Sequence, residues 1–225
     1  MTYLFIHGAW HNRACWSAVL PLLKATHHAM AIDLPGHGGN TMLYSAIRLN
    51  TYVDTVKQTV LALKTPVILV GHSLGGMVIS QVAEEIPEAI QSLVYVAGFL
   101  PQNGQSLLDI VQTFPQAELL QHTYRDRQRH SISLRPSAAL NRILSAPQQL
   151  TEPWHPFSDS VFLTQRRFGQ VKKIYIMCGA DRAIQKVDQL SMIRTYPEIE
   201  VREIPRAGHC PFKSDPEPLG RLLCE

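Results

Sequence analysis

The sequence predicts an α/β fold in which a mostly parallel central sheet of about six strands is flanked by helices. Strand-like apolar runs and amphipathic helix-like segments alternate over the first hundred residues, and the alternation resumes after about residue 167. Strands that alternate with helices in this way are typical of parallel sheets covered on both faces. With 225 residues and 45% hydrophobic content, the chain is long enough for one domain with a sizeable core.

The first four strands are expected from short apolar runs. They cover residues 3–6, 29–32, 67–70 and 92–96. Between the first two lies an amphipathic segment whose apolar positions are Trp16, Val19, Leu20 and Leu23. A capping box formed by Thr51 and Asp54 would open a helix before the third strand. The apolar positions of this helix recur at helical spacing: Val53, Val56, Val60 and Leu63.

The third strand leads directly into Gly71-His-Ser-Leu-Gly75, and an amphipathic helix follows at once and ends before Pro87. A serine nucleophile on a sharp strand-to-helix turn requires this order, with glycines that permit a strained backbone. The start of the helix also directs free N–H groups toward developing negative charge. Ser73 is therefore the candidate nucleophile. The alternative is a glycine-rich turn whose serine only caps the helix.

The alternation breaks between residues 101 and 167. This segment is rich in Gln, Arg, Ser and Pro and shows no strand-like runs, although short apolar helical pieces remain. We expect a core made of residues 1–100 and 168–225, with residues 101–167 inserted after the fourth strand as a helical cap or as a separate subdomain. Several arginines make the segment basic, and a solvated face explains them more simply than an anionic substrate: Arg125, Arg127, Arg129, Arg135 and Arg142.

The last elements follow this insertion. Strands are expected at residues 171–177 and 199–204, with a helix near 187–195 between them. Ser214 and Glu217 would open a final short helix.

Candidate partners for Ser73 follow these late strands. A serine hydroxyl needs a general base and a third group that orients the base, and in this kind of sheet they occur in the order serine, acid, histidine. Asp181 comes directly after one strand, and His209 lies in the loop after the last one, where open α/β sheets build their sites. Asp33 also follows a strand but precedes Ser73. The alternative for His209 is an ordinary surface-loop histidine.

Two hydrogen-bond donors are needed for the oxyanion of an acyl-transfer intermediate. One should be the backbone N–H of Leu74, the residue after the nucleophile. The other should be the N–H of Ala9, in the loop after the first strand, where Gly8 permits a close backbone approach.

Aromatic residues near these loops are candidates for an apolar substrate pocket, although packing of the core and cap would also explain them. The candidate substrate contacts are Trp10, Trp16, Phe99 and Trp154, with Phe114 and Phe157 as further members.

Composition excludes several classes of function. A net charge of +3 without a long basic run argues against a nucleic-acid partner, and no apolar run approaches the ~20 residues of a membrane span. Four widely spaced cysteines form no C-x-x-C pair, so zinc and redox motifs are absent. We expect no cofactor, no metal and no membrane partner.

Because a strand follows Met1 at once, we also expect no signal peptide and a cytoplasmic location. A homodimer is left open.

The motifs resemble the α/β-hydrolase superfamily, and more finely the branch that holds plant methylesterases, hydroxynitrile lyases of this fold and related bacterial esterases. The resemblance is carried by His7-Gly-Ala9 with Trp16, Ala31 to Leu34, Gly71 to Gly76, Val96 to Pro101, Lys172 to Ile176 with Asp181, and His209. It implies an α/β-hydrolase fold with a helical cap over the pocket, and a carboxylesterase- or methylesterase-like hydrolysis.

Three differences separate this chain from the lyases that it resembles. Those enzymes typically place threonine after the histidine of the first loop and lysine after the catalytic histidine, where this chain has Gly8 and Cys210. They often carry Gly-Glu-Ser-Cys-Gly at the nucleophile, where this chain has Gly-His-Ser-Leu-Gly. We therefore expect hydrolysis of a small, largely apolar carboxylic ester by a Ser-His-Asp acyl-enzyme mechanism. Lyase, C–C hydrolase or perhydrolase chemistry on the same residues, or a ligand-binding receptor, are the open alternatives.

Overall fold

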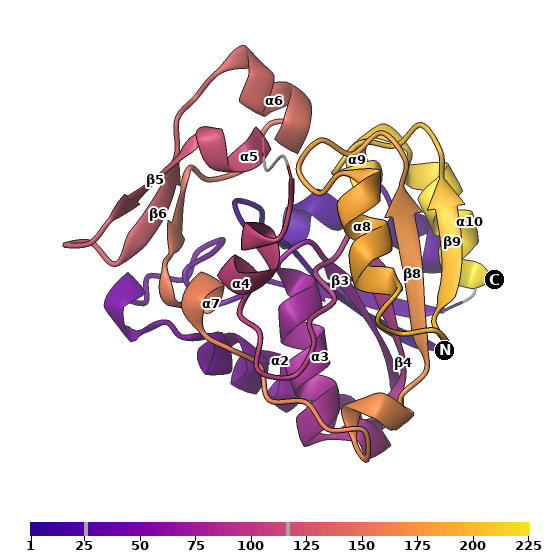
Figure 1. Cartoon of the computed structure of the whole chain (residues 1–225). Coiled ribbons are helices and arrows are strands. Elements are labelled where there is room, and N and C mark those ends of the chain that lie inside the picture. The colour runs from indigo at the N-terminus through magenta and orange to yellow at the C-terminus, as the bar shows by residue number, and fades with distance from the viewer. Residues whose placement is uncertain (25–26, 116–117) are drawn as a thin grey trace.

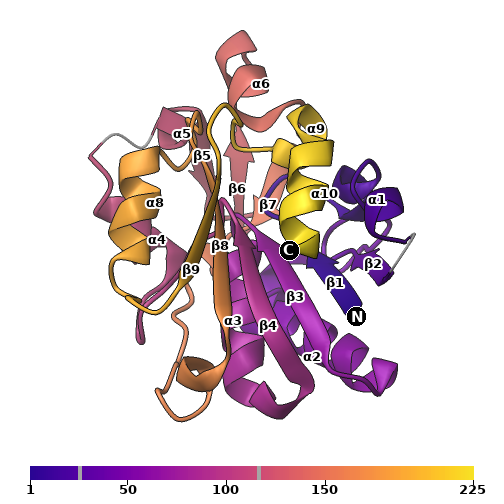
Figure 2. The ribbon, with the colours of Figure 1, turned by 90° about the vertical axis from the view of Figure 1, so that its right-hand side faces the viewer.

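The protein is described by a computed structural model that covers residues 1–24, 27–115 and 118–225. Within these residues the core is a six-stranded parallel sheet in the order β2-β1-β3-β4-β8-β9, of which Figure 1 labels β3, β4, β8 and β9 and Figure 2 also labels β1 and β2. Its strands are β1 (Thr2–Ile6), β2 (His28–Ile32), β3 (Val67–His72), β4 (Ile90–Val96), β8 (Lys173–Cys178) and β9 (Glu200–Ile204). The expected α/β-hydrolase fold is confirmed by this sheet and its flanking helices.

Helices cover both faces of the sheet because strand side chains alternate between two hydrophobic cores. Tyr3 and Phe5 pack into one core with α1 (Leu20–Lys24) and α10 (Pro216–Cys224), whereas Leu4 and Ile6 pack into the other with α2 (Leu49–Leu63) and α3 (Gly75–Glu85). Figure 2 shows α10 in front of the strands and α3 behind them. The α-helices that flank the sheet are α1 (Leu20–Lys24), α2 (Leu49–Leu63), α3 (Gly75–Glu85), α8 (Lys186–Ile193), α9 (Pro211–Ser214) and α10 (Pro216–Cys224).

Short 3₁₀ turns complete the core. They are η1 (Arg13–Trp16), η2 (Tyr44–Ala46), η3 (Pro87–Ala89) and η4 (Phe168–Gln170). Among the helices of the described residues, none combines the length and apolar character needed to cross a bilayer.

Helix α2 begins earlier than the sequence predicts. Arg48 is its N-cap and Thr51 is the third helical residue, whose hydroxyl accepts the Arg48 backbone N–H at 3.0 Å. Thr51 is therefore the third residue of the capping box, whose side chain reaches back to the N-cap, and it is not the N-cap itself. Asp54 instead pairs with Lys57 on the helix surface at 2.9 Å.

The segment between β4 and β8 contains strands, so the expectation that it has none is wrong. Beside α4 (Leu107–Gln112), α5 (Glu118–Gln121), α6 (Ala138–Leu144) and α7 (His155–Ser158), it forms a three-stranded antiparallel sheet. The strands are β5 (Thr123–Asp126), β6 (Ser131–Leu134) and β7 (Thr151–Pro153). They are short and carry arginine, serine and threonine, so they lack the apolar runs that mark the core strands.

The inserted segment leaves the central sheet intact. The chain leaves after β4 and returns in β8, and these two strands pair directly with each other. The hairpin of β5 and β6 projects away from the core, as Figure 1 shows on the left. The inserted segment therefore lies outside the central sheet and does not interrupt it.

Candidate active site

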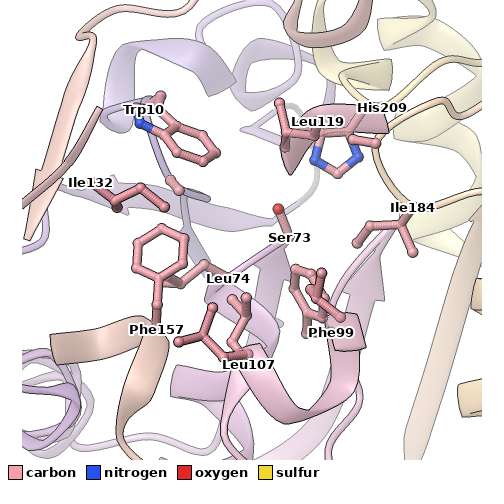
Figure 3. A pocket seen from close by; sticks show the side chains of 14 residues that line it. Trp10, Ser73, Leu74, Phe99, Leu107, Leu119, Ile132, Phe157, Ile184 and His209 are labelled. Carbon is pink, nitrogen blue, oxygen red and sulfur yellow. The ribbon is translucent and has the colours of Figure 1, made fainter. Parts of the chain in front are cut away.

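Ser73 lies on a sharp turn between β3 and α3. Its φ of 52° is in the left-handed region, which residues with a side chain rarely adopt. The turn is tight, because a Cβ on Gly71 would lie 2.7 Å from the Gly75 carbonyl oxygen. The Ser73 carbonyl accepts the N–H groups of Gly76 at 2.9 Å and Phe99 at 3.0 Å, which hold the turn in place. The strained backbone turns the Ser73 side chain into a pocket (Figure 3).

Asp181 and His209 are brought together by the loops that follow β8 and β9. Asp181 Oδ2 lies 2.8 Å from His209 Nδ1, and both residues are buried. The other oxygen, Oδ1, accepts the backbone N–H groups of Ala183 at 2.7 Å and Ile184 at 3.0 Å. These bonds fix the carboxylate, and the carboxylate fixes the imidazole so that Nδ1 carries the proton. Nε2 then remains as the ring nitrogen that can accept a proton.

His209 and Ser73 face the same pocket. Both line it, and Figure 3 shows the Ser73 oxygen and the His209 ring on neighbouring walls. Each supplies a polar side chain to a surface that is otherwise apolar among the lining residues described.

The N–H groups of Ala9 and Leu74 are available at this pocket. Both residues line it, and neither N–H has a hydrogen-bond partner within the described part of the chain. Gly8 makes the approach of the first loop possible, because a Cβ there would lie 2.7 Å from both Ser73 Cβ and His72 Nδ1. A backbone so close to the serine can reach the position of a developing oxyanion.

Buried histidines surround His209 without carrying charge. His72 Nε2 hydrogen-bonds to the His209 carbonyl oxygen at 2.8 Å, and the two rings lie 4.6 Å apart. Desolvation, with a further contribution from the charge that His209 can carry, holds the pKa of His72 well below its ordinary value. Desolvation likewise lowers the pKa of His11 to about 3. These neighbours therefore stay neutral and do not compete for the proton that His209 could accept.

The pocket is formed by the core loops and by the inserted segment. Its lining residues are Ala9, Trp10, Ser73, Leu74, Phe99, Leu107, Leu108, Val111, Leu119, Ile132, Phe157, Ala183, Ile184 and His209. Of the predicted substrate contacts, Trp10 and Phe99 lie in this wall, and Phe157 does so too. The leucines, Val111 and Ile132 had no signal in the sequence that distinguished them from ordinary core residues.

Two of the predicted substrate contacts lie elsewhere, and this corrects the expectation. Trp16 is fully buried against Phe5 and Phe212, with ring centroids 4.9 Å apart in each pair, in the core on the other face of the sheet. Trp154 is half-buried beneath Arg125, whose guanidinium carbon lies 3.8 Å from its ring centroid. Phe114 stacks on Phe99 behind the pocket wall.

Sequence reasoning also missed a buried carboxylate beside the first loop. Glu152 of β7 is fully buried against His37, with Oε2 and Nε2 2.8 Å apart, and it accepts the backbone N–H of Trp10. Glu152 is separated from these partners by more than one hundred positions, so local patterns carried no sign of the contact.

Comparison with known proteins agrees with this architecture. Residues 3–222 match the alpha/beta hydrolase family. Methylesterase 7 of Arabidopsis thaliana is 30% identical over 99% of this chain and 95% of the relative, and methyl jasmonate esterase 1 of Vitis vinifera is 29% identical with the same coverage. The solved structure of a pyrethroid hydrolase from Sphingobium faniae superposes with a TM-score of 0.89 at 25% identity, covering 100% of this chain and 96% of the other.

These similarities extend over nearly the whole chain and include both the core and the inserted segment. The chain belongs to the alpha/beta hydrolase family, as an esterase-like hydrolase.

Proposed function

We propose that the protein hydrolyses small, largely apolar carboxylic esters through an acyl-enzyme on Ser73. His209 acts as the general base and Asp181 orients it, while the N–H groups of Ala9 and Leu74 bind the oxyanion. The observation that carries this proposal is the 2.8 Å pair of Asp181 and His209 beside the pocket that holds Ser73 on its strained turn.

The reaction proceeds in two halves. His209 Nε2 removes the hydroxyl proton as Ser73 Oγ attacks the ester carbon, and the oxyanion forms against the two N–H groups. The imidazolium, stabilised by Asp181, then protonates the departing alcohol. In the second half, water loses a proton to His209 and attacks the acyl-enzyme, and Ser73 leaves with the proton from His209.

The apolar wall supports the substrate class. Apart from Ser73 and His209, the lining residues described offer aliphatic and aromatic side chains to the substrate. An ionised group on the substrate would be buried there without a partner, which is costly. Residues 101–167 act as the cap in this proposal, because they supply much of the wall. The names of the relatives as methylesterases fit a small alcohol group.

Lyase chemistry is less well supported. A Cβ on Gly8 would lie only 2.7 Å from Ser73 Cβ, so the threonine typical of the lyases has no room here. Cys210 occupies the position of their lysine and is buried, with Sγ directed to the Leu144 carbonyl oxygen at 3.3 Å. Neither position supplies the polar groups that cyanohydrin cleavage uses in those enzymes.

A panel of p-nitrophenyl esters tests the substrate class. We expect kcat/KM for the acetate and butyrate esters to exceed that for a hemisuccinate ester at least about tenfold, because the hemisuccinate carries a carboxylate into the apolar pocket. Equal rates for the charged and neutral esters would contradict the assignment. Stoichiometric labelling of Ser73 by a fluorophosphonate without ester turnover would favour a receptor instead.

A further inference from the structure

Glu152 is a buried carboxylate at the contact between the cap and the loop that follows β1. It belongs to the cap strand β7 and is only 1% exposed. Its Oε2 lies 2.8 Å from His37 Nε2, and its Oε1 accepts the Gln149 side-chain N–H at 2.9 Å. Oε1 also accepts the backbone N–H of Trp10. Burying a charge is costly unless it is paired and hydrogen-bonded, so this placement calls for a role beyond filling space.

The cap holds both peptide groups of Trp10. Besides the N–H that is bound by Glu152, the Trp10 carbonyl oxygen accepts the backbone N–H groups of Gln148 at 2.8 Å and Gln149 at 3.2 Å. Trp10 has a φ of 61°, in the left-handed region that is unfavourable for a residue with a side chain. A conformation of this kind persists where surrounding contacts hold it, and here those contacts come from residues 148–152.

The peptide that the cap holds is the one next to the proposed oxyanion donor. Trp10 directly follows Ala9, so the plane of the Ala9–Trp10 peptide limits how the Ala9 backbone can turn. Because Glu152 takes the Trp10 N–H, that donor is directed to the cap, while the N–H of Ala9 lies at the pocket without a partner among the described residues. Hydrogen bonds to an oxyanion stabilise it only when the donors are already aimed at its position.

His37 completes the arrangement as the counter-ion of Glu152. Its Nδ1 lies 3.1 Å from the Pro35 carbonyl oxygen and its Nε2 faces the carboxylate, so both ring nitrogens have acceptors, as an imidazolium requires. The ring of His7 lies 4.5 Å away. His7 Nε2 accepts the Leu34 N–H at 3.0 Å, so that ring is neutral.

We propose that Glu152, held by His37, is a positioning residue for the oxyanion hole. The cap then does more than line the pocket, because one of its carboxylates fixes the backbone that presents the Ala9 N–H. This inference rests on the proposed ester hydrolysis and adds a residue that touches neither the substrate nor Ser73.

The test is the isosteric variant Glu152→Gln, assayed with p-nitrophenyl butyrate. Removing a single oxyanion donor costs about 10²–10³ in kcat, and a misplaced donor should cost part of that. We expect kcat to fall about tenfold to a hundredfold with KM changed less than about twofold. Affinity for a trifluoromethyl ketone, which forms a tetrahedral oxyanion adduct with the serine, should fall by the same factor. Affinity for the matching alcohol, which forms no adduct, should not change.

Glu84→Gln is the matched control. Glu84 is also a buried carboxylate that ties the end of the cap segment to the core, accepting the N–H groups of Thr164 at 2.7 Å and Phe168 at 3.1 Å, but it lies near the end of α3. We expect that variant to lose thermal stability and to keep kcat. If Glu152→Gln fails to fold, Glu152→Asp retains the charge for His37 and withdraws the carboxylate from Trp10, and a fall in kcat is again expected.

Unchanged kcat and unchanged trifluoromethyl ketone affinity in a folded Glu152 variant would overturn the positioning role. So would an equal loss of affinity for the ketone and the alcohol, since that would show general damage to the pocket. The proposed function fails separately, if Ser73→Ala turns over the ester as fast as the wild type.

Discussion

Gly8 lies where the neighbouring residues leave no room for a side chain. A Cβ at this position would lie 2.7 Å from Ser73 Cβ and from His72 Nδ1, a separation that real Cβ atoms essentially never show. Ser73 is held by its own strained turn, and His72 is buried, so neither can move away cheaply. Gly8 therefore sets the distance between the first loop and the serine.

Gly8→Ala is expected to lower kcat at least about tenfold, because the added methyl group displaces Ser73 or the Ala9 N–H from its place. Steady-state kinetics with p-nitrophenyl acetate measure the effect. Gly39→Ala is the control, since a Cβ there would lie within 4 Å of no atom of the residues that the structure describes, and it should keep full activity. A Gly8→Ala enzyme with wild-type kcat would show that the close approach does not matter.

At the scale of elements, the start of α2 is joined to the end of the cap. Asp159 follows α7, and its carboxylate accepts the Leu49 backbone N–H at 3.0 Å and pairs with the Arg48 guanidinium at 2.6 Å. A carboxylate at a helix N-terminus satisfies a free N–H and interacts favourably with the helix dipole. The contact links a core helix to the segment that leads back into the sheet.

Asp159→Asn is expected to lower the free energy of unfolding by about 1 kcal/mol, since it weakens a charge-assisted hydrogen bond at the helix start. Urea denaturation followed by circular dichroism gives the value. Asp54→Asn on the outer surface of α2 is the comparison, because an exposed ion pair such as Asp54 with Lys57 contributes roughly 0–1 kcal/mol. Equal losses in the two variants would argue against a special role for Asp159.

The core strands and the short apolar helices of the inserted segment were predictable from the sequence, whereas the strands of that segment were not. Strands such as β3 are buried on both faces, so they read as continuous apolar runs with little ambiguity. Strand β5, Thr-Tyr-Arg-Asp, has both faces partly exposed, and its pairing with β6 was invisible in its composition. The start of α2 was misplaced because Thr51 serves the capping box from its third position.

For the molecule as a whole, the candidate site combines motifs that sequence order exposes with contacts that only the fold creates. Ser73, Asp181 and His209 could be found because each follows a core strand and their order along the chain is informative. Glu152 could not, because its partner Trp10 lies 142 positions away and a lone glutamate in a basic segment gives no sign of burial.

The buried histidines also affect the whole molecule through pH. Desolvation, aided at His7 by the neighbouring His37, holds the pKa values of His7 and His72 well below their ordinary range, and it lowers the pKa of His11 to about 3. Each of these groups binds a proton in the unfolded chain near pH 6.5 and not in the folded protein. Because these histidines stay neutral in the folded protein, the free energy of unfolding decreases as the pH falls below 6.5.

His37 behaves in the opposite sense. Burial lowers its pKa, but the charge and hydrogen bonds of Glu152 outweigh burial, so the pKa is raised. Its stabilising contribution is complete below the unfolded pKa of about 6.5 and is lost as the pH rises through the raised value. Between pH 6.5 and 5 His37 therefore does not make the free energy of unfolding depend on pH. The three neutral histidines dominate the pH dependence in this range.

We expect the free energy of unfolding to fall as the pH is lowered from 6.5 to 5, by about 1.4 kcal/mol per pH unit for each neutral histidine. Urea titrations at several pH values measure this slope. His11→Asn should reduce this slope by the contribution of one histidine, about 1.4 kcal/mol per pH unit, whatever the effect of the substitution on stability at neutral pH. A slope that does not change in His11→Asn would contradict a neutral His11.

The proposed ester hydrolysis requires Ser73 as its nucleophile. The most direct measurement compares p-nitrophenyl acetate hydrolysis by the wild-type protein and by Ser73→Ala, with circular dichroism to show that both are folded. We expect ready turnover by the wild type and a fall of about 10⁴-fold or more in kcat for the variant. A folded Ser73→Ala protein that hydrolyses the ester at the wild-type rate would contradict the proposed mechanism.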